Sequence, residues 1–247
     1  MIPVNHELNS DRKSDVRMIG EGSSSGGAFR KIRIMGQGRL DGEASCQTFR
    51  CTGDSSILGQ LSASSFKLLG NMHIEGGLSG DSASMLGELR VDGTLQVRLM
   101  KLIGAMRVGQ HLRGEKLKCA GQLEIQGDST AEQIRIRGVI MAGGAVNAEH
   151  IRIKLNGPSH ASELCGAQID VQQAFLSWFP SFRSRRISRT LTVDLIEGDN
   201  IRLEHVEAKV VRGRRVTIGP GCQIGLVEYT EKYKEHHTAK VGESVRQ

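Results

Sequence analysis

The sequence predicts an all-β fold, a three-sided parallel β-helix built from 17-residue coils, and three regularities carry that prediction. Glycine recurs at an unbroken interval of 17 residues. Apolar residues fall at even offsets from this glycine, and a second column of small residues follows six positions later. A fixed short period is typical of a solenoid in which each repeat is one coil stacked on the last. The recurring glycines are Gly36, Gly53, Gly70, Gly87, Gly104, Gly121 and Gly138.

The apolar columns show that the coils consist of strands. They lie two and four residues before each glycine and two, four and eight residues after it. Alternation with a period of two indicates strand, because successive side chains of a strand point to opposite faces. In one representative coil these residues are Met100, Leu102, Met106, Val108 and Leu112.

Three breaks in each coil predict three short strands and therefore three sides. The first break is the recurring glycine, and the second is the small-residue column, which only Gln110 interrupts. Polar residues such as Ser64 and Glu115 mark the third break, eleven positions after the glycine. Glycine suits such corners because it accepts backbone angles that a β-carbon forbids. We expect right-handed winding, since parallel crossover connections are overwhelmingly right-handed.

Composition agrees with a narrow solenoid and indicates a reducing compartment. Aromatic residues make up only 4% of the 247 residues. The five cysteines form no CxxC pair, and Cys51 and Cys119 fall in an inward column, so we expect buried structural thiols. No apolar run approaches the length of a membrane-spanning helix, and Met1–Asn5 is too short for a signal peptide. A cytoplasmic location is expected.

The chain divides into a central solenoid and two polar tails. Residues 1–28 contain a Gly/Ser cluster and are predicted as a flexible tail. Residues 29–229 form the solenoid, with an aromatic and Arg-rich insertion near 174–189. Residues 230–247 are charged and without pattern, which predicts a disordered tail.

The insertion is a candidate surface for a membrane or a partner. Aromatic residues together with arginines suit such a contact. The alternative is a loop that packs its aromatic rings on the solenoid and leaves its arginines in water. The residues are Phe175, Trp178, Phe179, Phe182, Arg183, Arg185, Arg186 and Arg189.

A basic ladder is the second candidate surface. Lysine or arginine lies three residues before most of the recurring glycines and faces outward. This ladder is either a stripe for an anionic partner or a solvated edge that resists sideways aggregation. The net charge of +6 is modest and argues against a dedicated nucleic-acid binder. The ladder consists of Arg33, Arg50, Lys67, Lys101, Lys118, Arg135 and Arg152.

The ends of the solenoid are the third candidate surface. A β-helix exposes unpaired strand edges and a slice of core at each end unless a cap covers them. Neither tail contains an obvious amphipathic cap, so the ends are expected to stack and form filaments. The alternative is that a tail or the insertion folds back over an end. The expected polymer interface comprises Phe29, Ile32, Ile34, Ile218, Ile224 and Leu226.

The sequence gives little support for catalysis. It contains no phosphate loop and no metal-ligand spacing, so no enzyme, cofactor or metal is expected. A hexapeptide-type acyltransferase is the most serious enzymatic alternative, because residues 216–226 hint at its short-turn pattern. Such an enzyme needs a catalytic histidine, for which His205 is the nearest candidate.

The register of Gly36 to Gly138, flanked by pairs such as Ile32 and Ile34, resembles that of the bactofilins. These are bacterial polymer-forming cytoskeletal proteins, and the resemblance covers roughly residues 32–226. It implies a right-handed β-helix that polymerises end to end without nucleotide, alone or with a related bactofilin. It also implies roles in cell shape, envelope organisation or motility, with envelope or motility proteins or the inner face of the membrane as partners. The length of the chain and its insertion depart from the commonest bactofilin pattern.

Other β-helices with short coils have a similar sequence pattern. The C-terminal domain of the septum-site inhibitor MinC is one of them. The alternative function is therefore an interaction module that binds a protein or a membrane and does not polymerise.

Overall fold

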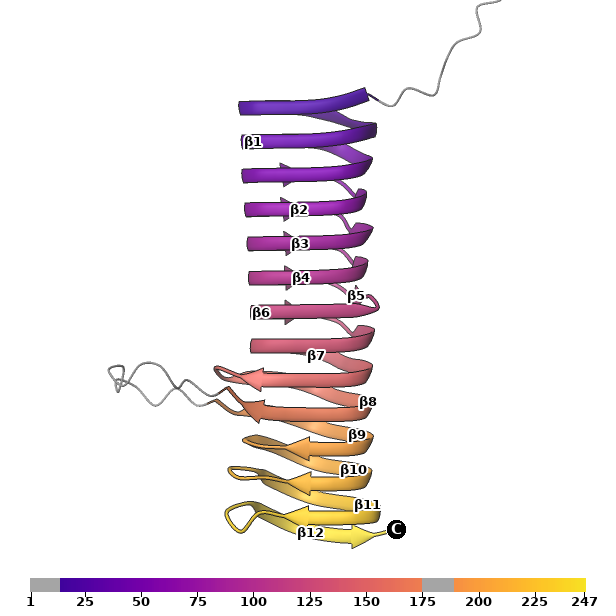
Figure 1. The fold of residues 1–247 in the computed structure, drawn as a ribbon, viewed down its shortest axis with the longest axis vertical. Helices are drawn as coiled ribbons and strands as arrows, with labels where there is room; N and C mark the ends of the chain where they lie inside the picture. The colour runs from indigo at the N-terminus through magenta and orange to yellow at the C-terminus, as the bar shows by residue number, and fades with distance from the viewer. Residues whose placement is uncertain (1–13, 175–188) are drawn as a thin grey trace, which may run out of the picture.

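The computed structural model describes residues 14–174 and 189–247, and this part of the chain contains strands and no helix. Its coils stack along one straight axis (Figure 1). The strands are β1 (Ser14–Ile57), β2 (Leu61–Ile74), β3 (Leu78–Val91), β4 (Leu95–Val108), β5 (Leu112–Arg113), β6 (Lys116–Ile125), β7 (Ser129–Leu155), β8 (Ser159–Gln173), β9 (Leu191–Leu203), β10 (Val206–Ile218), β11 (Gln223–Glu235) and β12 (Lys240–Arg246).

All pairings between these strands are parallel, and they join into one 12-stranded sheet that runs from β1 to β12. From Ala44 to Ala142 each paired residue has its partner 17 positions later in the chain. Leu69, for example, pairs with Leu86, which pairs with Ile103. The predicted all-β parallel solenoid with 17-residue coils is confirmed.

The core is a thin column of inward side chains, one layer per coil. The predicted even-offset columns are buried, as Leu102 and Met106 illustrate with exposed fractions of 1% and 2%. Phe49 and Phe66 occupy one column in adjacent coils, and their rings stack with centroids 5.3 Å apart. Because each core layer touches only the layers above and below it, coil-to-coil register decides which side chains meet.

The recurring glycine is required at its corner for two reasons. Its φ is positive at every repeat, from 117° at Gly36 to 147° at Gly138, a region that L side chains rarely adopt. The corner also brings successive backbones close together. A Cβ on Gly104 would lie 2.0 Å from the carbonyl oxygen of Gly87, and a Cβ on Gly138 would lie 1.8 Å from that of Gly121. Only glycine fits this column.

The glycine column ends after Gly138, and the corner is built differently from there on. Leu155 takes the next place in the column and is fully buried. From the end of β7 on, loops close this side of the coils (Figure 1), at residues 156–158, 204–205, 219–222 and 236–239 among the described residues. We call residues 14–155 the N-terminal array and residues 159–246 the C-terminal array.

The structure corrects the predicted N-terminal tail. Residues 14–28 belong to β1 and form the first coil, in which Met18 is buried. Arg30 of the second coil donates two hydrogen bonds, of 2.9 and 2.6 Å, to the carboxylate of Asp15. Small residues occupy most of this coil, including inward Gly22, so its Gly/Ser composition has the appearance of a linker. Residues 1–13 lie outside the described part of the chain.

The predicted C-terminal tail is also corrected. β11 continues to Glu235, and β12 pairs with it from Gln223–Lys240 to Tyr229–Arg246. The outward positions of both strands carry many charges, which conceal the alternation. Their inward residues Tyr229, Tyr233 and Val241 pack against the core cluster. The solenoid therefore extends one coil further at each end than the sequence indicated.

Candidate functional site

From the second coil of the N-terminal array on, one side is basic and free of acidic residues, whereas the same side of the first coil carries Asp15, which pairs with Arg30. Eight five-residue segments precede the glycine corner or its equivalent, and they occupy successive coils: 31–35, 48–52, 65–69, 82–86, 99–103, 116–120, 133–137 and 150–154. None of them contains Asp or Glu. We call their outward surface the cationic face. Its basic residues are Lys31, Arg33, Arg50, Lys67, Lys101, Lys116, Lys118, Arg135, Arg137, Arg152 and Lys154.

The charges of this face are largely unpaired. Among the described residues, only Arg152 of the cationic face forms an ion pair, at 3.3 Å from Asp170 of β8. Lys67 and Lys101 are exposed, two coils apart in the same column. Stacked strands are about 4.8 Å apart, so like charges along the column repel each other. The predicted ladder exists as a structural feature and, Asp170 apart, no acidic residue of the described ranges forms an ion pair with it.

An exposed apolar column borders the basic ladder, and it is not among the surfaces predicted from the sequence. It lies one residue before the glycine, and its side chains are Ile19, Met35, Leu69, Leu86 and Ile103, exposed by 64, 45, 49, 50 and 45%. The register places Leu69, Leu86 and Ile103 side by side in consecutive coils. The signal was an apolar column at an odd offset. Such a column must face outward when the core columns lie at even offsets.

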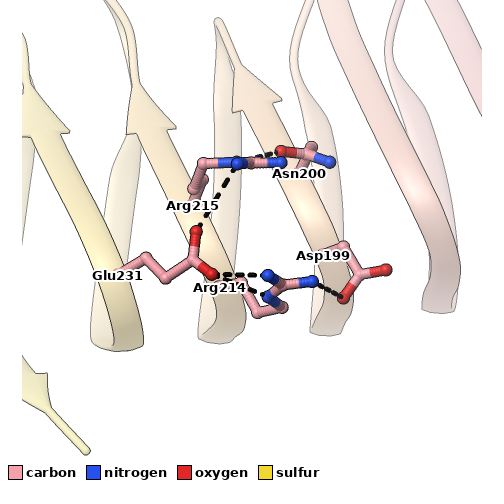
Figure 2. Close-up of polar contacts among 5 residues, drawn as sticks. All are labelled: Asp199, Asn200, Arg214, Arg215 and Glu231. Carbon is pink, nitrogen blue, oxygen red and sulfur yellow. Dashed lines mark hydrogen bonds and ion pairs between the residues drawn. The ribbon is translucent and has the colours of Figure 1, made fainter.

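The C-terminal array treats its charges differently. Arg214 of β10 pairs with Glu231 of β11 and with Asp199 of β9, and Arg215 bonds to Asn200 and Glu231 (Figure 2). The Arg215 Nε–Asn200 Oδ1 distance is 2.6 Å. The hydrogen bond from Arg214 lowers the pKa of Glu231 below its ordinary value. Arg212, Arg214 and Arg215 thus have acidic partners in an adjacent coil.

The predicted polymer interface lies inside the solenoid rather than at its ends. Ile32, Ile34, Ile218 and Ile224 are buried, with exposed fractions of 1, 1, 1 and 3%, and Phe29 and Leu226 are half-buried. The added coil at each end covers them. Among the described residues, the real N-terminal end is the coil of Val16 and Met18. The real C-terminal end is β12 together with the second half of β11.

Both end strands leave an edge of the sheet open within the described residues. β1 and β12 are the two ends of the strand order, and each has a single neighbouring strand. Most of β12 is exposed, while Val241 is half-buried. Tyr229 and Tyr233 stack at 5.3 Å between ring centroids, and the Tyr233 hydroxyl donates to Glu235 over 2.7 Å.

Most of the aromatic and Arg-rich insertion lies outside the described residues. This holds for Phe175, Trp178, Phe179, Phe182, Arg183, Arg185 and Arg186, whose proposed contact stays a prediction. Arg189 is described and half-buried, directly before β9.

The thiols are held in the neutral form. All five cysteines are free, and Cys51, Cys119 and Cys222 are buried. Burial raises the pKa of Cys46 to about 11 and that of Cys119 to about 12. Since the thiolate is the nucleophile and the metal ligand, these groups are poorly suited to either task near neutral pH.

The described residues bring together no group of three or more His, Cys, Asp or Glu side chains that could hold a metal ion. His205 occupies the turn between β9 and β10 with a φ of 55°, and a Cβ on Gly221 would lie 2.5 Å from its ring nitrogen. None of the described residues lies in a helix long and apolar enough to cross a membrane.

Two proteins of Bacillus subtilis (strain 168) are similar to parts of this chain. Uncharacterized protein YhbF is 47% identical over 74 residues, which are 30% of this chain and 29% of YhbF. Uncharacterized protein YhbE is 50% identical over 56 residues, which are 23% of this chain and 24% of YhbE. The match thus spans less than a third of either relative. No family model matches the chain. No solved structure matches it significantly.

Proposed function

We propose that this protein is a structural scaffold that assembles end to end into filaments without nucleotide. The observation that carries the proposal is that, within the described residues, a wholly parallel sheet has an open edge at each end, in β1 and in β12. An unpaired strand edge is a template for another chain, because its N–H and C=O groups lack partners.

The polarity of the sheet makes the two ends complementary to each other. In a parallel solenoid, the first coil of one copy has the strand direction needed to continue the last coil of another. Such a head-to-tail contact is heterologous and generates an open filament rather than a closed ring. The stack would continue the inward columns, with Val16 over Tyr233 and Met18 over Glu235. Asp15 would meet Lys232 on the outside.

The cellular role follows from the resemblance of the repeat to the bactofilins. On that basis the filaments would serve cell shape, envelope organisation or motility in the cytoplasm. The partners would be further copies of this chain or a related bactofilin. The buried, protonated thiols and the lack of a metal cluster among the described residues are compatible with a scaffold.

The second candidate is a non-polymerising module that binds a partner through its side. The cationic face favours it, since a stripe of unpaired charge on a rigid solenoid suits recognition. Filament formation separates the two candidates.

The test is negative-stain electron microscopy of the untagged full chain at several salt concentrations, with no nucleotide. We expect filaments of the wild type. Val241→Arg should disperse them, because it places a charge in the half-buried position of the last strand, and Val16→Arg should do so at the other end. Gln96→Arg adds the same charge to the outside of β4 and should leave them intact.

Each outcome decides between the candidates. Filaments that survive both end variants contradict stacking through these ends. A wild type that gives only small uniform particles contradicts polymerisation and leaves the interaction module.

A further inference from the structure

We propose that the cationic face of the N-terminal array binds the surface of an anionic lipid bilayer. This inference concerns the side of the solenoid, goes beyond the proposed assembly through its ends and does not depend on it.

The charge of the face fits a sheet of anionic headgroups. The eight segments carry basic residues and no acids, and among the described residues only Arg152 has an acidic partner. From residues 31–35 to residues 150–154 there are seven coil steps of about 4.8 Å, so the face is about 34 Å long. The coils stack along a straight axis (Figure 1), and the register places the basic positions of successive coils side by side. A charged bilayer would supply the missing counter-charges to the whole row at once.

The apolar column beside the ladder favours lipid over other anions. Leu69, Leu86 and Ile103 are about half exposed in consecutive coils, each two residues after the ladder position, which holds Lys67, Ser84 and Lys101. Aliphatic side chains next to lysine or arginine suit the boundary between headgroups and acyl chains. Exposure of these side chains to water is unfavourable, and contact with acyl chains would remove that cost.

Nucleic acid and a second copy of the chain fit this face less well. Proteins that bind single-stranded nucleic acid stack bases on aromatic rings, and the outward positions of the eight segments contain no Phe, Tyr or Trp. A second copy that used the same face would bring two unpaired basic rows together, which is unfavourable because like charges repel.

Acidic residues border the face and would fix its orientation. Asp54 and Glu88 follow the glycine corner on one side, and Asp81 and Glu115 precede the segments on the other. Asp54, Asp81 and Glu88 are exposed. An anionic membrane repels these carboxylates, so rotation of the solenoid away from the cationic face is disfavoured. The structure thus carries an attractive surface and repulsive margins.

The experiment is vesicle co-sedimentation of the full chain with phosphatidylcholine alone and with roughly one-third phosphatidylglycerol. We expect binding to the anionic vesicles only, and weaker binding as salt rises. The triple variant Lys67→Gln, Lys101→Gln, Lys118→Gln should bind about 100-fold more weakly, at roughly five-fold for each charge.

The matched control removes the same number of charges elsewhere. Arg90, Arg107 and Lys209 already pair with Asp92, Glu124 and Asp194, so the triple Gln variant at these positions should bind as the wild type does. Equal losses of affinity for anionic vesicles in the two triple variants would show that only the net charge of the protein matters. That result would overturn the proposal.

A third variant tests the apolar column. Leu69→Ser, Leu86→Ser and Ile103→Ser together should weaken binding to anionic vesicles several-fold while leaving the fold intact, since these side chains are exposed. Unchanged binding would overturn the lipid assignment. So would binding to a labelled DNA duplex, lost in the lysine variant, with no binding to vesicles. The lysine variant should still form filaments, because its substitutions lie on the side of the solenoid and not at its ends. Failure of the lipid proposal can therefore be told apart from failure of the filament proposal.

Discussion

The two arrays bury the same kind of core but turn the same corner by different means. In the N-terminal array the strand runs through the corner, and glycine at positive φ lets successive backbones meet there. In the C-terminal array a loop replaces that corner, and the residue in the glycine column is buried Leu155 or a successor such as Gln173. A continuous corner keeps the coil at 17 residues from Ala44 to Ala142. A loop allows the coil length to vary, since Leu191 pairs with Ser159 on one side and with Val206 on the other.

The outer surfaces differ in the same sense. The C-terminal array pairs cations across coils, as Arg214 does with Glu231. The N-terminal array pairs Arg107 with Glu124 on one side and leaves the cationic face without acids. Since both arrays form the same continuous sheet, unpaired cations are not a requirement of the fold. The difference is what directs attention to the cationic face as a binding surface.

The largest expected effect separates the two kinds of corner. Gly104→Ala should lower the free energy of unfolding by more than about 3 kcal/mol, because it adds positive-φ strain to a backbone clash. Its Cβ would lie 2.0 Å from the carbonyl oxygen of Gly87. Urea denaturation followed by circular dichroism measures the change.

Gly157→Ala is the control in the loop-type corner. Its Cβ would meet only the end of the Val139 side chain, at 2.8 Å, and its φ is not in the left-handed region. That side chain can move, so we expect a loss below about 1 kcal/mol. Similar losses at the two positions would show that the corners do not differ in the way described.

A smaller effect concerns the thiols of the two arrays. Burial raises the pKa of Cys119 in the N-terminal array to about 12 from an ordinary value near 9. Below pH 9 the folded and unfolded thiols are both protonated, and the stabilisation is complete. As pH rises from 9 toward 12 the unfolded thiol ionises and the folded one does not. The free energy of unfolding should therefore fall by about 1.4 kcal/mol per pH unit.

The measurement is the difference in unfolding free energy between the wild type and Cys119→Ala, followed from pH 8 upward. Subtraction of the variant removes the titration of lysines and tyrosines. Cys165 of the C-terminal array is only half-buried, so Cys165→Ala should show a shallower dependence. A difference for Cys119 that stays constant with pH would contradict its burial.

Particular residues show why sequence reasoning succeeded in the middle of the chain and failed at its ends. Between residues 29 and 155 the period is exact. The repeat therefore identifies Gly104 as a corner residue and Met100 and Met106 as inward residues. In the first coil, Gly22 and other small residues stand where larger apolar residues would reveal the period. In the last coil, Tyr233 and Glu235 bring a hydroxyl and a carboxylate into inward columns that hold apolar side chains in the other coils.

The candidate surfaces follow the same distinction. The basic ladder could be predicted because the position three residues before the recurring glycine holds lysine or arginine in most coils. The exposure of the neighbouring apolar column of Leu69, Leu86 and Ile103 was harder to predict. It required knowing that residues at odd offsets face outward and that no other segment covers them. The ends of the solenoid could not be placed from the sequence. Each end coil packs against one neighbouring coil instead of two, so its residues follow the apolar alternation less strictly.

The smallest expected effect asks whether the unpaired charges have a cost in stability. Ser84 is exposed in the basic ladder and pairs with Lys67 and Lys101 of the adjacent coils. Ser84→Glu should place a carboxylate between the two ammonium groups and raise the free energy of unfolding by about 0.2–1 kcal/mol at low salt. The gain should disappear at high salt, because exposed charges are screened.

Glu231→Gln is the converse change in the C-terminal array, since it removes the shared partner of Arg214 and Arg215 (Figure 2). It should lower stability at low salt and lose its effect at high salt. If Ser84→Glu stabilises the protein and also weakens its binding to anionic vesicles, the chain retains a less stable surface that binds lipid. If Ser84→Glu destabilises the protein at low salt, repulsion between the basic residues of the ladder does not lower its stability. The two arrays would then not differ in the energy of their surface charges.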